Sequence, residues 1–235
     1  MLLKNLTLSI FFGLMFFYSP AQQPISIIPQ PVMGGEESFV SMLDTASSLP
    51  PVFDDSYYGG VIHEIREMQI MNMGQYSHGN QPIQHMIYLY NYAGQPWKTQ
   101  YWSREVINRL NKQTPDGYCG YEDNGQTSAL YIFSVLGFYP VCQGTDQYVL
   151  GAPLFKKVNA QLPSGKSLVI NAAANSADNK YVQQLKWNNA LYNKNYLTHF
   201  DLLKGGILNF SMGPMLNFTR GTTIESYPYS FSTNK

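Results

Sequence analysis

Residues 120–126 (GYEDNGQ) place two adjacent carboxylates, Glu122 and Asp123, between two glycines. An almost wholly apolar segment, residues 126–138, follows directly and predicts a buried helix. Unpaired amides and the helix dipole favour negative charge at a helix N-terminus. The pair is therefore either a carboxylate site or a cap, in which Asp123 or Asn124 holds the first turn. Spacing alone favours the cap, because adjacent carboxylates are common.

Two other polar patterns are candidates for chemistry. His63 and Glu67 are four residues apart, so a helix would put them on one face, with Glu64 beside them. No second His follows at helical spacing, which favours a half-buried His bonded to a carboxylate over a metal site. Residues 76–82 (YSHGNQP) offer oxygen ligands of the kind that calcium prefers, or form an ordinary Asn turn.

The elements that carry these groups change type at about residue 140. Apolar residues recur at helical spacing in the first half, and Gly or Pro interrupts the pattern. The sequence predicts about five helices, over residues 34–47, 61–73, 82–93, 97–110 and 126–138. The second half alternates apolar and polar residues between turn signals. Strands are expected at residues 148–150, 157–162, 167–171, 181–187, 197–199 and 207–212, and form a small antiparallel β module. The fold class is α+β.

The first 32 residues have a different composition. Lys4, an apolar run over residues 6–18 and the small-residue exit Ser19-Pro20-Ala21 are typical of a signal peptide, here residues 1–21, with an uncleaved anchor as the alternative. Residues 22–32 form a proline-rich linker. We therefore expect an exported protein, in the periplasm or outside the cell. Cys119 and Cys142 would meet an oxidising compartment, and the spacing leaves open whether they pair.

The composition of the chain excludes some functions. Its 235 residues carry 15 Lys+Arg and 15 Asp+Glu, so the formal net charge is zero and no nucleic-acid partner is expected. Hydrophobic residues make up 44%, which argues against disorder. The low charge and the 18 tyrosines suit a surface that binds neutral polar ligands such as sugars.

Four long segments together resemble one family. Residues 59–68 (GGVIHEIREM), 75–100, 117–144 and 148–158 (YVLGAPLFKKV) look like glycoside hydrolase family 92, whose members are calcium-dependent exo-acting α-mannosidases. The resemblance runs from about residue 33 to 212. It implies that residues 33–144 are the closing part of an (α/α)6-barrel catalytic region and that residues 145–235 are the C-terminal β module.

The resemblance also implies an inverting mechanism, with one carboxylic acid as general acid and another carboxylate as general base. Asp123 matches the family's general base, and Glu122 is a supporting residue. The loop's first Asp, which assists the base in the family, falls on Tyr121 here. A phenol cannot replace a carboxylate in that task.

The same resemblance implies the substrate and metal contacts. His63 and Glu64 match the pair that contacts the sugar beyond the scissile bond in α-1,2-selective members. The expected substrate-binding residues are His63, Glu64, His78, Asn80 and Gln81, and Asn80 and Gln81 are the expected calcium ligands. The partners implied are α-mannoside glycans of the N-glycan type, with a membrane involved only through the signal peptide.

The family's general acid is a Glu upstream of the matched region, but no Glu or Asp precedes Glu36. The N-terminal sandwich and about half the barrel have no counterpart in the sequence. The expected function is a C-terminal part of an α-mannosidase with little turnover alone, which has the upstream half as a possible partner. The alternative is a non-catalytic exported remnant or glycan-binding module.

Overall fold

A computed structural model describes residues 7–8, 35–52 and 56–230 of the chain. The expected linker lies outside the described residues, as does the expected signal peptide except for β1 (Thr7–Leu8), which pairs with β4. Both stay predictions. Within the described ranges, no helix has the length and apolar character needed to cross a membrane.

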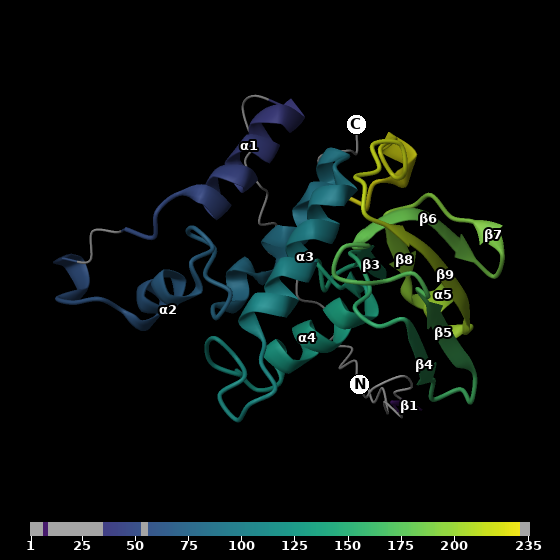
Figure 1. The fold of residues 1–235 in the computed structure, drawn as a ribbon, viewed down its shortest axis with the longest axis horizontal. Helices are drawn as coiled ribbons and strands as arrows, with labels where there is room; N and C mark the ends of the chain where they lie inside the picture. The colour runs from purple at the N-terminus through teal and green to yellow at the C-terminus, as the bar shows by residue number, and fades with distance from the viewer. Residues whose placement is uncertain (1–6, 9–34, 53–55, 231–235) are drawn as a thin grey trace.

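All five predicted helices are present in the first half of the chain (Figure 1). They are α1 (Gly35–Ser48), α2 (His63–Met71), η2 (Gln81–Ala93), α3 (Pro96–Leu110) and α4 (Gln126–Leu136), and a short turn of 3-10 helix, η1 (Ser56–Tyr58), precedes α2. One difference is that η2 is a 3-10 helix. Another is that α4 ends at Leu136, two residues early, because Gly137 takes the left-handed conformation (φ 96°) that ends helices.

The second half forms two sheets. The smaller one has the order β2 (Phe138–Tyr139), β3 (Gln147–Leu150), β8 (Tyr196–Thr198). In the larger one, β1 is followed by β4 (Lys157–Gln161), β5 (Ser167–Asn171), β9 (Gly206–Gly213), β6 (Tyr181–Trp187) and β7 (Ala190–Leu191). In the larger sheet, β4 and β5 bury alternate side chains, as the sequence pattern predicts; β5, for example, buries Leu168 and Ile170. In the smaller sheet, β2 and β3 bury consecutive side chains.

Two details of the β module differ from expectation. Most neighbouring strands are antiparallel, but β9 inserts between β5 and β6 and lies parallel to β5. The predicted strand at residues 197–199 stops at Thr198, and His199 begins a short helix, α5 (His199–Leu203). The side chain of Thr198 causes this ending, because its hydroxyl accepts the amide hydrogen of Asp201 and so caps α5.

Helix α3 runs along the sheets (Figure 1), and buried polar side chains join the helical half to the strands. Arg104, only 3% exposed, donates to the Pro153 carbonyl at 2.7 Å and to Asn175 Oδ1 at 2.6 Å. From η2, Asn91 donates to the Leu150 carbonyl at 3.0 Å. These bonds fix α3 and η2 against the β module, because a buried polar group left unpaired would cost free energy.

Candidate functional site

The loop before α4 holds three consecutive residues in the left-handed region: Asp123 (φ 53°), Asn124 (φ 56°) and Gly125 (φ 97°). Such values are uncommon for residues other than glycine, and strained backbone of this kind gathers at functional sites. The side chain of Asp123 is exposed. The turn thus presents the Asp123 carboxylate to solvent at the start of a buried helix.

Glu122 caps α4. Its carboxylate accepts the amide hydrogens of Gly125 at 2.6 Å and Ser128 at 3.4 Å. Bonds with Ser128 and Gly125 lower the pKa of Glu122, because they favour its charged form. Spacing favours Asp123 or Asn124 as the cap of this helix, but in the structure Glu122 is the capping residue.

The start of α2 places His63 and Glu64 at the surface. His63 Nδ1 lies 3.3 Å from Glu64 Oε2, and the His63 side chain is 55% exposed, in agreement with a half-buried His paired with a carboxylate. Its ring meets the Tyr121 ring nearly at right angles, with centroids 5.3 Å apart. The two candidate segments, residues 63–64 and the loop at 120–126, are therefore in contact.

Glu67, on α2, contacts the loop before α4 and the loop before η2. In the sequence, the only sign of this position is its spacing of four residues from His63. Glu67 Oε2 is buried and has no hydrogen-bond partner, and it lies where a Cβ on either Gly79 or Gly120 would stand. Burial raises the pKa of Glu67; His63 opposes this shift, and the negative charges of Glu64 and Asp123 add to it.

His78, an expected substrate-binding residue, is buried in the loop before η2. It is 2% exposed, and its Nδ1 lies 2.9 Å from the Tyr76 hydroxyl. Its backbone carbonyl accepts a hydrogen bond from Gln84 Nε2 at 3.2 Å. Burial lowers the pKa of His78 to about 4, so the ring is neutral at pH 7. Through these bonds His78 supports the loop before η2, and its contact with substrate stays a prediction.

Asn80 and Gln81 lie at the start of η2, where a pocket of about 390 Å³ opens. Gln81 lines this pocket together with Pro82, His85, Gln126, Tyr139, Val141 and Gln143. Gln126 Nε2 donates to the Tyr139 hydroxyl at 3.1 Å, and burial lowers the pKa of His85. The pocket is therefore lined by hydrogen-bonding groups without formal charge, which suits a polyhydroxylated neutral ligand.

A calcium ion would find oxygen ligands at the junction of these loops. Over the part of the chain that the structure describes, no three His, Cys, Asp or Glu side chains cluster as metal ligands. Calcium, however, also accepts amide and carbonyl oxygens. The unpartnered Glu67 Oε2 suits a cation, and an exchange of N and O in the Gln81 amide, whose Nε2 is buried without a partner, would add an acceptor. On this observation the residues that fit are Glu67 and Gln81, and Asn80, which directly precedes Gln81, stays an expected ligand.

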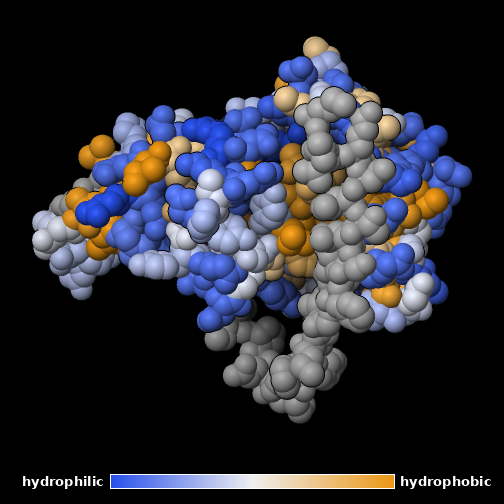
Figure 2. All heavy atoms as spheres, turned by 60° about the horizontal axis from the view of Figure 1, so that its bottom comes forward, coloured by the Kyte–Doolittle hydropathy of each residue, from blue (hydrophilic) through white to orange (hydrophobic). Residues whose placement is uncertain are grey.

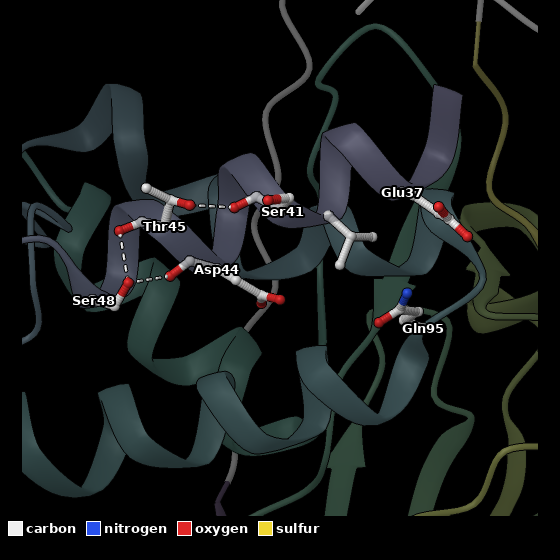
Figure 3. Close-up of a pocket in the computed structure, with 7 residues that line it drawn as sticks. Glu37, Ser41, Asp44, Thr45, Ser48 and Gln95 are labelled. Atoms are coloured by element: carbon white, nitrogen blue, oxygen red, sulfur yellow. Dashed lines mark hydrogen bonds between the residues drawn. The ribbon is translucent and has the colours of Figure 1, made fainter. Parts of the chain in front are cut away.

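A second pocket, of about 350 Å³, lies along α1 (Figure 3). Its hydroxyl groups bond back to their own helix, as Thr45 does to the Ser41 carbonyl at 2.6 Å. Asp44 pairs with Lys98 and accepts a hydrogen bond from the Tyr90 hydroxyl. These polar groups already have partners, so this pocket is a weaker candidate than the one at η2 and α4.

The two cysteines are both free thiols, which answers the question that their spacing leaves open. Cys119 is partly buried and Cys142 is exposed. Burial raises the pKa of Cys119 to about 11, so its thiol is protonated at pH 7.

Comparison with known proteins gives one consistent family. Residues 30–214 match the glycosyl hydrolase family 92 catalytic domain. A family GH92 inverting mannosidase from Bacteroides thetaiotaomicron is 53% identical, with a TM-score of 0.72 over 85% of this chain and 27% of that one. A family GH92 α-mannosidase from the same organism, solved with mannoimidazole, is 35% identical, with a TM-score of 0.74 over 84% of this chain and 25% of that one.

A curated relative, described as an uncharacterized secreted glycosidase of Arthroderma benhamiae, is 29% identical over 138 residues. That alignment takes in 57% of this chain and 18% of the relative. The chain thus spans about a fifth to a quarter of the proteins that it resembles.

Proposed function

Because the chain belongs to glycosyl hydrolase family 92, we propose that it is part of an inverting, calcium-dependent, exo-acting α-mannosidase with Asp123 as general base. The observation that carries this proposal is the strained turn that exposes the Asp123 carboxylate, in a loop whose Tyr121 ring contacts His63. Glu122 holds the turn by capping α4, which leaves Asp123 as the carboxylate aimed outward.

In the proposed reaction, water attacks the anomeric carbon while Asp123 takes its proton, and a carboxylic acid protonates the leaving oxygen on the opposite face. The first carboxyl groups in the sequence, Glu36 and Glu37, lie in the first turn of α1 and do not match the acid's motif. We propose that a barrel segment outside this sequence supplies the acid. Residues 33–144 would then be the closing part of that barrel, and residues 145–235 the β module.

The pocket at η2 and α4 is our proposed place for the terminal mannose, since its lining offers uncharged donors and acceptors. His63 and Glu64 would contact the next sugar, which favours α-1,2 linkages. Glu67, Asn80 and Gln81 would hold the calcium ion. When bound, calcium supplies positive charge that favours distortion of the sugar ring towards the transition state.

A glycan-binding or remnant protein without turnover is the second candidate, and Tyr121 favours it. The phenol stands where the resemblance places an Asp that assists the base. Exposed apolar side chains at the η1–α2 end of the molecule (Figure 2) also indicate a surface made for a partner. These residues are Val52, Tyr57, Tyr58, Val61 and Ile70. For a partner-binding surface of this kind, a polypeptide corresponding to the part of the family 92 relatives that this chain does not span is the partner we propose.

The decisive experiment measures hydrolysis of α-1,2-mannobiose, in calcium, by the chain alone and by the chain joined to the upstream region of a family 92 relative. We expect little turnover from the chain alone, because loss of a general acid costs about 10²- to 10⁴-fold. The joined protein should release mannose with inverted configuration. Asp123→Asn should abolish this activity, and Asp116→Asn, at another exposed loop position, should not.

Wild-type turnover in Asp123→Asn would rule out Asp123 as the base. A joined protein that binds mannobiose without cleaving it would favour the glycan-binding candidate. The proposed export of the protein has its own test, since the mature N-terminus should follow Ala21.

A further inference from the structure

Tyr121 is 64% exposed, yet the backbone on both sides of it is fixed. Before it, Gly120 packs so closely on Gly79 that an added Cβ would lie 2.6 Å from the Gly79 Cα. After it, the Tyr121 carbonyl accepts a hydrogen bond of 2.9 Å from the Thr127 hydroxyl. The phenol ring therefore projects from rigid backbone into solvent.

A single exposed aromatic ring is ordinary on a protein surface. Tyr121 differs because the exposed His63 ring stands against it at 74°, which forms a corner of two rings. The T-shaped contact covers at most one face of the Tyr121 ring. The carboxylate of Glu64 lies 3.3 Å from His63 Nδ1, so hydrogen-bonding groups border the rings.

We propose that Tyr121 and His63 form a platform for the leaving-group sugar of the substrate, which makes Tyr121 a specificity-determining residue. The inference rests on the proposed function. A pyranose ring has an apolar C–H face and a rim of hydroxyls. The face of the Tyr121 ring matches the apolar C–H face of the sugar. The Tyr121 hydroxyl, the His63 imidazole and the Glu64 carboxylate around it match the rim of hydroxyls.

The position of the platform assigns it to the leaving-group side. The pocket proposed for the terminal mannose is lined from η2, α4 and residues 139–143, and includes no residue of α2. Tyr121, in the loop before α4, contacts His63 at the start of α2. Asp123 follows Tyr121 by two residues, a span of at most about 7 Å, so the base stays close to a sugar on the platform.

The test compares the affinities of the full chain for methyl α-mannoside and α-1,2-mannobiose by isothermal titration calorimetry. We expect Tyr121→Ala to weaken mannobiose binding about tenfold and to leave the monosaccharide affinity unchanged. Tyr121→Phe, which keeps the ring, should bind mannobiose within about twofold of the unmodified chain. Melting temperatures equal to that of the unmodified chain would show that both variants are folded.

Phe200→Ala is the matched control. Phe200 is 66% exposed and makes the same kind of T-shaped contact with a histidine, His199, but on α5 in the β module. Its loss should change neither affinity. Unchanged mannobiose affinity in Tyr121→Ala would overturn the platform and leave the proposed function standing. Failure of the unmodified chain to bind either sugar would overturn the platform, whereas the proposed function is tested separately by the activity of the joined protein.

Discussion

The backbones of Gly79 and Gly120 lie in direct contact, so that a Cβ on Gly120 would stand 2.6 Å from the Gly79 Cα. The loop before η2 and the loop before α4 meet at this point. Glu67 Oε2 lies at the same place, within 2.9 Å of where that Cβ would be. Three segments that carry candidate site residues are thus held together by two residues without side chains.

Gly120→Ala should therefore destabilise the protein by about 1–3 kcal/mol, because the added methyl group would force the two backbones apart. The free energy of unfolding in urea measures the effect. Gly144→Ala is the control, since an added Cβ there meets nothing within 4 Å. Equal stability of the two variants would mean that the loops separate without cost.

Calcium should raise the melting temperature, and Glu67→Gln should remove that response. Binding at 100 times the Kd adds about 2.7 kcal/mol of stability. Without calcium, the raised pKa of Glu67 means that its ionised form is disfavoured, so the Gln variant should be at least as stable as the unmodified chain. Glu64→Gln should keep the calcium response. A calcium response that survives in Glu67→Gln would exclude Glu67 as a ligand.

Stability should fall as the pH drops from about 6.5 to about 4, because the unfolded chain binds a proton at His78 in that range and the folded chain does not. The lowered pKa of His78 corresponds to a loss of up to about 3 kcal/mol once the pH is below 4. His78→Gln should flatten this slope, and His85 should account for part of the remainder. Urea unfolding at several pH values tests this, and an unchanged slope would contradict it.

Arg104→Met should cost about 3 kcal/mol, since it leaves the Pro153 carbonyl and Asn175 Oδ1 unpaired in a buried place. Arg109→Met, on the same helix, is the control. Arg109 is exposed and bonds the carbonyls of Met71 and Asn72, so its loss should cost less than about 1 kcal/mol. If Arg104→Met lowered the free energy of unfolding as little as Arg109→Met does, the contact between α3 and the β module would contribute little.

The sequence predicts much of the local structure, since its signals act over a few residues. The helix η2 ends at Ala93, as predicted, because Gly94 adopts the left-handed conformation that is open to glycine. The ends of α2 and α4 fall two residues earlier than predicted, because Asn72 and Gly137 take the same conformation. Alternation of apolar residues predicts β4 and β5 to within one residue, because side chains along a strand face opposite sides. The contact between His63 and the loop of Asp123 joins two segments that the resemblance already associates with the substrate.

What the sequence by itself determined was therefore the type and approximate bounds of the elements and the family of the chain. Only the tertiary structure decided that His78 is buried, that Glu67 lies between two glycines and that β9 enters the sheet beside β5. Burial and strand pairing depend on residues far apart in the chain. Gly79 and Gly120 meet across 41 positions, and no local propensity encodes such a contact.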